Sequence, residues 1–305
     1  MHGENGKMKF KRSVSRAGIV LAVMLAAVGC RGKGGGRDSG ASGPSAGEAV
    51  SSDGVAIHYQ VQGSGRPALV FVHGWCCDGS FWDAQTVRFS RGHKVVTVDL
   101  AGCGKSGRGR RKWTIEAFGG DVAAVVKKLG LRDVVLVGHS MGGDVIVEAE
   151  HELGGCVRGL VAVDSFRSLK GLSAEQIKAF VGGFRSDFRG RMNGFVRSVF
   201  GPAAEPALVE RVVERMSGAP QGPALASLEA LQRWRGEKLA EALGRVRVPI
   251  AAINSDMRDT DVNGFESRFA GMKFRIMSGV GHFVMMEDAE RFNGLLDEAL
   301  KEMRR

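Results

Sequence analysis

The chain has 305 residues and a formal net charge of +10. Its length suits one large α/β domain with an insertion, or two small domains. Residues 1–37 carry eight Lys and Arg residues and one Glu, so they hold +7 of this charge and leave +3 for the rest. Because a charge of +3 is too small for an extended basic face, we expect no nucleic-acid partner.

Residues 1–29 have the pattern of a secretory signal peptide. Basic residues between Lys7 and Arg16 precede an apolar run over residues 19–28, which is too short to span a bilayer. The end of the run, Leu25-Ala-Ala-Val-Gly-Cys30, resembles a bacterial lipoprotein signal, although Ala27 replaces the usual Leu. This interpretation predicts export and a lipid on Cys30 that holds the protein to a membrane surface facing the periplasm or the exterior. The alternative is a soluble exported protein.

A flexible tether is expected over residues 30–50. This segment is rich in Gly, Ser and Ala, a composition that cannot bury a core. It would place the folded part of the chain at a distance from the membrane surface.

Apolar runs that alternate with helical patterns predict the fold class. Residues 55–61 alternate as in a half-exposed strand, and continuous apolar runs favour buried parallel strands. These runs cover residues 68–72, 94–98, 134–137, 159–163 and 248–253, and a last strand is expected over 273–277. Helices are expected over 114–129, 141–151 and 288–303. The order predicts an α/β fold with a mostly parallel central sheet and helices on both faces.

The segment Gly138-His139-Ser140-Met141-Gly142 stands between a predicted strand and a predicted helix. This arrangement is typical of a nucleophile elbow, in which a sharp turn exposes the serine hydroxyl. The pattern gains its meaning from this position, because G-x-S-x-G arises by chance in a chain with 45 Gly. The alternative is a glycine-rich turn whose Ser140 caps the helix. We expect His139 to pack under the elbow.

Two other patterns suggest different chemistry. Gly102, Gly104 and Gly107 match a dinucleotide fingerprint, but a polar loop follows them and the next helix begins only near Thr114. The adjacent residues Cys76 and Cys77 offer a possible nucleophile, but no second histidine in the nearby sequence supports this role. Because the Cys spacing also matches no zinc pattern, we expect no metal and no cofactor.

Four segments together resemble the α/β-hydrolase family. They are His73-Gly-Trp75, Asp99-x-x-Gly-x-Gly-x-Ser106, the elbow around Ser140, and Gly279-Val-Gly-His282 near the C-terminus. Their order and their places at strand ends are those of the family. The resemblance covers residues 51–305 apart from an insertion. It implies a core of residues 51–165 and 246–305 and a helical cap of residues 166–245.

The resemblance implies a catalytic triad and an oxyanion hole. Ser140 would be the nucleophile and His282 the base, in the chain order of this family. The acid would follow a strand end, with Asp256 as first choice and Asp259 or Asp164 as alternatives. The backbone amides of Trp75 and Met141 would stabilise the oxyanion.

The insertion carries aromatic residues at helical spacing, including Phe180, Phe184 and Phe188, with Phe195 and Phe200 beyond. We expect some of these rings to line an apolar pocket and most to form the cap core. The predicted function is a serine hydrolase, similar to a carboxylesterase, for a small, largely apolar ester. The alternatives are a lipid-anchored binding protein without activity and a C–C hydrolase or perhydrolase on the same fold. A third class of function that remains to be tested is that of a nicotinamide-dependent oxidoreductase.

Overall fold

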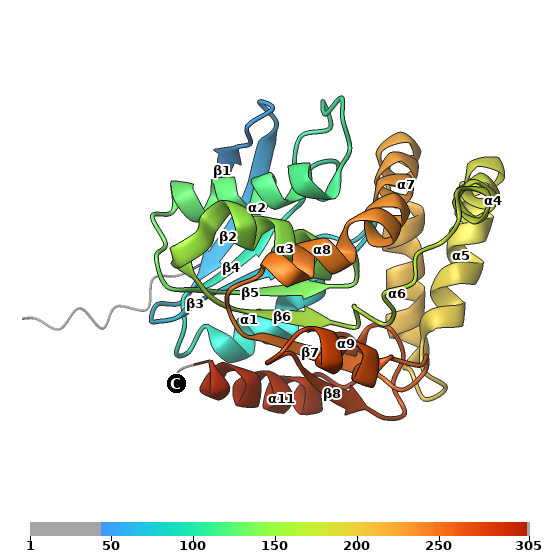
Figure 1. The fold of residues 1–305 in the computed structure, drawn as a ribbon. Coiled ribbons are helices and arrows are strands. Elements are labelled where there is room, and N and C mark those ends of the chain that lie inside the picture. Colours follow the sequence, from blue (N-terminus) through green and yellow to red (C-terminus); the bar gives the residue numbers. More distant parts are fainter. Residues whose placement is uncertain (1–43, 304–305) are drawn as a thin grey trace, which may run out of the picture. The chain divides into compact units, whose positions relative to one another are not determined.

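A computed structural model describes residues 44–303, and the predicted signal segment and Cys30 lie outside this range. The strands are β1 (Ser45–Val50), β2 (Ala56–Gln62), β3 (Ala68–Val72), β4 (Val95–Val98), β5 (Val134–His139), β6 (Val157–Val163), β7 (Ile250–Ser255) and β8 (Lys273–Met277). They form one sheet in the order β1-β2-β4-β3-β5-β6-β7-β8 (Figure 1).

The strands from β4 to β8 in this order are parallel to one another. The β1–β2 and β2–β4 pairs are antiparallel. Strands β3 to β6 are almost completely buried, which explains their continuous runs of Val and Leu. The predicted fold class is therefore confirmed.

Strand β1 corrects the predicted extent of the tether. The sequence predicts a tether that includes residues 45–50, but these residues pair along their whole length with β2. The pairing aligns Ala49 with Ile57, and both side chains are buried. An edge strand is held mainly by backbone hydrogen bonds, so β1 lacks the continuous apolar run that marks the central strands.

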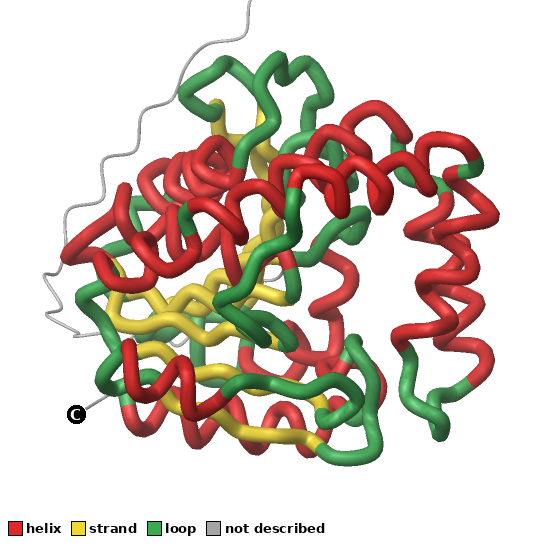
Figure 2. Tube along the Cα trace, turned by 45° about the vertical axis from the view of Figure 1, so that its right-hand side comes forward, coloured by secondary structure: helices red, strands yellow, loops and turns green. Residues whose placement is uncertain are grey.

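Figure 2 shows the described helices in red. They fall into two groups according to their place in the chain. Those outside the insertion are α1 (Asp83–Phe89), α2 (Ile115–Lys128), α3 (Met141–Leu153), α9 (Val262–Arg268), α10 (Val284–Glu287) and α11 (Ala289–Glu302), and two short 3-10 turns cover Gly79–Trp82 and Gly154–Cys156. Helices α2 and α3 lie on one face of the sheet, and α1 and α11 lie on the other (Figure 1).

Five further helices lie between β6 and β7, within the segment predicted to form a cap. They are α4 (Ala174–Ser186), α5 (Phe188–Val199), α6 (Pro206–Ser217), α7 (Gln221–Glu237) and α8 (Leu239–Arg245). The C-terminal part of α7 is fixed to the sheet domain, since Trp234 Nε1 donates to Glu148 of α3 at 2.8 Å. No helix within residues 44–303 has the length and hydrophobicity needed to cross a membrane.

Candidate active site

Ser140 occupies a sharp turn between β5 and α3. Its backbone has a φ of 51°, a left-handed conformation that is unfavourable for a residue with a side chain. The flanking glycines permit this turn: a Cβ at Gly138 would lie 2.1 Å from the Gly142 carbonyl oxygen, and one at Gly142 would lie 2.4 Å from the Val72 oxygen. The strand, turn and helix therefore have the geometry predicted for a nucleophile elbow.

His282 lies in the loop between β8 and α10. Its Nδ1 is 2.5 Å from Oδ2 of Asp164, and its backbone N–H donates to the Val199 oxygen at 2.7 Å. A carboxylate only accepts, so Nδ1 carries the proton and Nε2 has a free lone pair. His282 and Ser140 line the same cavity.

Asp164 follows β6 directly and is buried. Its Oδ1 accepts a hydrogen bond from the Ser255 N–H at 2.8 Å and a second from Arg167 Nη2. Burial acts to raise the pKa of this carboxyl, but the hydrogen bond from His282, the charge of His282 and that of Arg167 outweigh it and lower the pKa to about 2. Asp164 is therefore a carboxylate at neutral pH.

The geometry favours Asp164, an alternative in the sequence prediction, over the first choice, Asp256. Asp256 is exposed, and its Oδ1 accepts from the Gly279 N–H at 3.0 Å, so its carboxylate caps a turn. Asp259 is also exposed. The contact with His282 that was expected from Asp256 is made by Asp164, because the turn after β6 and not the turn after β7 directs its carboxylate at the imidazole.

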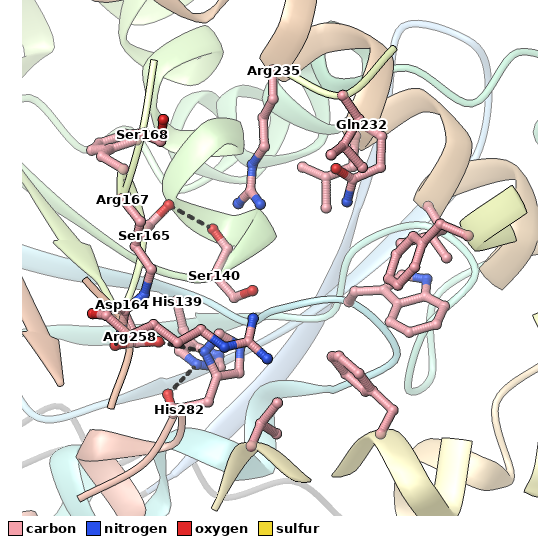
Figure 3. A pocket seen from close by; sticks show the side chains of 18 of the residues that line it. His139, Ser140, Asp164, Ser165, Arg167, Ser168, Gln232, Arg235, Arg258 and His282 are labelled. Atoms are coloured by element: carbon pink, nitrogen blue, oxygen red, sulfur yellow. Dashed lines mark hydrogen bonds and ion pairs between the residues drawn. The ribbon is translucent and has the colours of Figure 1, made fainter. Parts of the chain in front are cut away.

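Asn254 at the end of β7 fixes the turn that carries Asp164. Its Nδ2 donates to the Ser165 oxygen at 2.8 Å and its Oδ1 accepts from the Ser165 N–H at 3.1 Å, while Ser165 Oγ donates to the Ser140 oxygen at 3.1 Å (Figure 3). This role is not evident from the sequence, although a polar residue at the end of a buried strand is a signal for it.

Glu287 was also missed as part of the site. Its carboxylate accepts from the backbone N–H groups of Gly201 and Gly281, each at 2.8 Å, and of Phe283 at 3.1 Å. Gly201 follows α5, whereas Gly281 and Phe283 flank His282. One carboxylate thus joins the inserted helices to the loop of His282.

The loop after β3 lies against the elbow. A Cβ at Gly74 would stand 3.3 Å from the Cβ of Ser140. Within residues 44–303, neither the Trp75 nor the Met141 backbone N–H donates a hydrogen bond. The assignment of these two amides to an oxyanion hole stays a prediction.

His139 packs beneath the elbow, as the sequence predicted. Its ring centroid lies 4.6 Å from that of His282, and its Nε2 donates to the His282 carbonyl oxygen at 2.9 Å. Burial lowers its pKa to about 3, and the charge of His282 adds to this effect. His139 is therefore neutral at physiological pH and supports the backbone of His282.

A cavity of about 430 Å³ opens above Ser140 and is bounded by the sheet domain and the inserted helices (Figure 3). Its apolar lining comes from Trp75, Val199, Met216, Leu228, Leu231 and two cap rings, Phe180 and Phe195. Phe184, Phe188 and Phe200 are buried in the core. The expected division of the aromatic residues between pocket and core is therefore observed.

The competing patterns have structural roles. The Gly102 N–H donates to the Gly107 oxygen at 2.9 Å, so the three glycines form a closed turn ahead of α2. Burial raises the pKa of the Cys76 and Cys77 thiols well above the usual value, so neither is a thiolate at neutral pH.

Comparison with known proteins agrees with this architecture. A model of the "Alpha/beta hydrolase family" matches residues 69–295, more than half of the chain. The esterase of Exiguobacterium antarcticum has a similar fold, with a TM-score of 0.75 at 21% identity over 83% of this chain and 98% of that one. The chain therefore belongs to the alpha/beta hydrolase family.

Curated relatives match over a shorter length. A non-heme haloperoxidase of Rhodococcus erythropolis is 42% identical over 34% of this chain and 39% of its own length. A bifunctional esterase/perhydrolase of Acinetobacter calcoaceticus is 39% identical over 32% of this chain and 36% of its own length. The chain thus spans less than two fifths of the length of either relative.

Proposed function

We propose that the protein is a serine hydrolase that cleaves an ester of a small molecule through an acyl-enzyme. The observation that carries this proposal is the pairing of His282 with Asp164 in the cavity that also contains Ser140 at its elbow. A serine hydroxyl becomes a competent nucleophile only when a nearby base removes its proton. His282, oriented by a buried carboxylate, is suited to that role.

Each residue has a defined part in the proposed reaction. Ser140 Oγ attacks the ester carbonyl, and its proton passes to His282 Nε2. Asp164 stabilises the resulting imidazolium, which then protonates the leaving alcohol as the C–O bond breaks. In the second half, His282 accepts a proton from water as the water oxygen attacks the acyl carbon. The imidazolium then returns this proton to Ser140 Oγ as the acyl C–O bond breaks, which releases the acid and restores both residues.

Two backbone amides supply the proposed oxyanion hole. Trp75 and Met141 would donate to the carbonyl oxygen as it gains charge, and each such donor contributes about 3 kcal/mol of transition-state stabilisation. Trp75 is held in place by its Nε1, which donates to the Ala224 oxygen of α7 at 2.8 Å.

The apolar wall of the cavity supports an apolar part in the substrate. Trp75 and Phe195 are packed edge to face, with ring centroids 6.1 Å apart, and Leu228 and Leu231 belong to the same lining. Such surfaces bind a hydrocarbon chain or ring by removing it from water. The esterase names of the relative from Acinetobacter and of the structural neighbour agree with this proposal.

A fluorophosphonate probe tests the proposal directly, because it reacts only with an activated serine. We expect labelling of the wild type, no labelling of Ser140→Ala, and labelling at least about a hundredfold slower in His282→Ala. Turnover of p-nitrophenyl butyrate should follow the same order. Asp256→Asn is the matched control and should label like the wild type.

Three outcomes would contradict the proposal. Full labelling of Ser140→Ala would place the nucleophile elsewhere, and unchanged turnover in His282→Ala would exclude the proposed base. A folded wild type that binds esters without labelling or turnover would instead favour a binding protein on the same fold.

Perhydrolysis is a second candidate, favoured by the similarity to the bifunctional esterase/perhydrolase. In that reaction hydrogen peroxide replaces water, attacks the acyl-enzyme and releases a peracid while Ser140 regains its proton. Peracid formation from acetate and hydrogen peroxide can be followed by bromination of monochlorodimedone. Loss of the signal in Ser140→Ala would support it, and absence of signal in an active esterase would remove it.

We also propose that the enzyme acts outside the cytoplasm, attached to a membrane through Cys30. The support is the leader pattern of residues 1–29 and the cysteine that follows it. Expression in a bacterial host with an alkyne fatty acid tests this. We expect lipid incorporation into the wild type and none into Cys30→Ser, and equal incorporation in both would refute the assignment.

A further inference from the structure

The lining of the cavity above Ser140 is rich in cationic side chains. It includes four basic residues, Arg167, Lys170, Arg235 and Arg258, and among residues 44–303 Asp164 is the only carboxylate that lines the cavity. Asp164 is already shared by His282 and Arg167. A pocket built for a purely apolar ester has no use for three further cations, because each must be partly desolvated when such a substrate binds.

Arg235 is placed for a ligand by a buried partner. Its Nε and Nη2 donate to Oδ2 of Asp144, at 3.0 and 2.7 Å, and Asp144 is completely buried in α3. The guanidinium is thereby fixed along one edge, while Nη1 makes no hydrogen bond within residues 44–303. Figure 3 shows this guanidinium directed into the cavity toward Ser140.

Arg258 provides a second guanidinium from the turn after β7. Its side chain is exposed, lines the cavity, and forms no ion pair within the described part of the chain. Arg167 holds this turn, because its Nη1 donates to the Arg258 carbonyl oxygen. Lys170 adds a further exposed cation to the lining. The positive charge of Arg258 and Lys170 is thus available to a ligand.

We propose that the substrate is an ester or lactone that carries a carboxylate, which Arg258 and the free edge of Arg235 bind beside the reacting acyl group. This inference rests on the proposed serine hydrolase function. Guanidinium groups bind carboxylates through charge-assisted, often bidentate hydrogen bonds, which are stronger than neutral ones. The hydrocarbon part of the same molecule would lie on the wall of Trp75, Leu228 and Leu231.

Matched esters test the proposal on the full-length protein. Monomethyl adipate at pH 7.5 is an anion, and methyl hexanoate is its counterpart with a methyl group in place of the carboxylate. Monomethyl succinate and glutarate extend the comparison to shorter chains. We expect kcat/KM for the best anionic ester to exceed that of its neutral counterpart by about tenfold or more, as one charge-assisted contact allows.

Two variants assign the preference to residues. Arg258→Gln should reduce the ratio of the two kcat/KM values toward one. Arg235→Lys should also reduce it, because a lysine retains the ion pair with Asp144 but lacks the second guanidinium edge. Arg233→Gln is the matched control, since Arg233 lies on α7 next to this site and pairs with Glu229 outside the cavity at 2.9 Å. This control should retain the wild-type ratio.

Protection of Ser140 from the fluorophosphonate gives a second readout that needs no turnover. The anionic ester should slow labelling at a lower concentration than the neutral one. Equal protection and equal kcat/KM in a protein that labels would overturn the carboxylate proposal alone, and so would a ratio unaffected by both variants. A folded protein that does not label would overturn the proposed hydrolase function.

Discussion

The turns that follow β6 and β7 begin alike and differ in what they do. Each opens with an aspartate, Asp164 and Asp256, at the carboxyl ends of two neighbouring parallel strands. Asp164 is buried and bonded to His282, whereas Asp256 is exposed and bonded to the Gly279 N–H. A carboxylate at a strand end is therefore not sufficient to make a catalytic acid.

The difference lies in the donors that surround each turn. The turn of Asp164 is fixed by Asn254, Arg167 and the Ser255 N–H, and Asp164 itself has a φ of 46°. Two of these contributors, Asn254 and Ser255, belong to β7, and Arg167 belongs to the segment after β6 itself. Strand β7 thus supplies contacts that fix the turn, and β6 leads into the turn that carries the acid, Asp164.

The largest expected effect is on kcat, when each of the two aspartates is replaced in turn by asparagine. Asp164→Asn should lower kcat about 10⁴-fold, because an amide no longer stabilises the imidazolium and favours the wrong tautomer of His282. Asp256→Asn should change kcat less than about twofold, as for a surface substitution. Steady-state turnover of p-nitrophenyl butyrate measures both.

The reverse ranking of these two variants would show that the turn after β7 moves its carboxylate to His282 in the working enzyme. Circular dichroism of each variant serves as the control for folding.

Removing the side-chain contacts of Asn254 with the turn of Asp164 should have the next largest effect. Asn254→Leu leaves the backbone N–H and C=O of Ser165 buried without their partners, and we expect the free energy of unfolding to fall by about 2–3 kcal/mol. Urea denaturation measures this change. An unaltered midpoint would mean that the turn after β6 holds its shape without β7.

The pH dependence of stability gives the smallest of the three effects. The folded pKa of Asp164, about 2, lies below its usual value of 3.8, so its stabilisation is complete above 3.8 and is lost as the pH falls through 2. Between pH 4.5 and 2 the wild type should lose about 2 kcal/mol more stability than Asp164→Asn. Parallel pH profiles of the two proteins in urea denaturation would contradict this.

Much of the fold could be predicted because its elements are strongly patterned. The expected helix over 288–303 is α11 (Ala289–Glu302), and the expected strand over 273–277 is β8 with identical bounds. The helix expected to begin near Thr114 is α2, and Thr114 caps it, with its side chain accepting from the Ala117 N–H at 3.1 Å. Strand β1 escaped prediction because an edge strand needs no apolar run.

The site was predictable where one segment alone determines the geometry. Ser140 lies within a single strand–turn–helix motif, so its position followed from local sequence. Asp164, Asn254 and Arg235 depend on which distant segments meet, and nothing in the local sequence distinguishes Asp164 from Asp256. The charge of the cavity was missed for the same reason, since its cations come from three separate segments.

The carboxylate of Glu287 has a mechanical consequence. It joins Gly201, the second residue after α5, to both neighbours of His282, and the His282 N–H is bonded to the Val199 oxygen of α5. Any displacement of α5 large enough to admit a substrate by this route would also pull on the imidazole. Substrate entry and proton transfer could then not occur at the same time. While the cavity is open to bulk water, His282 would be out of position to act as a base.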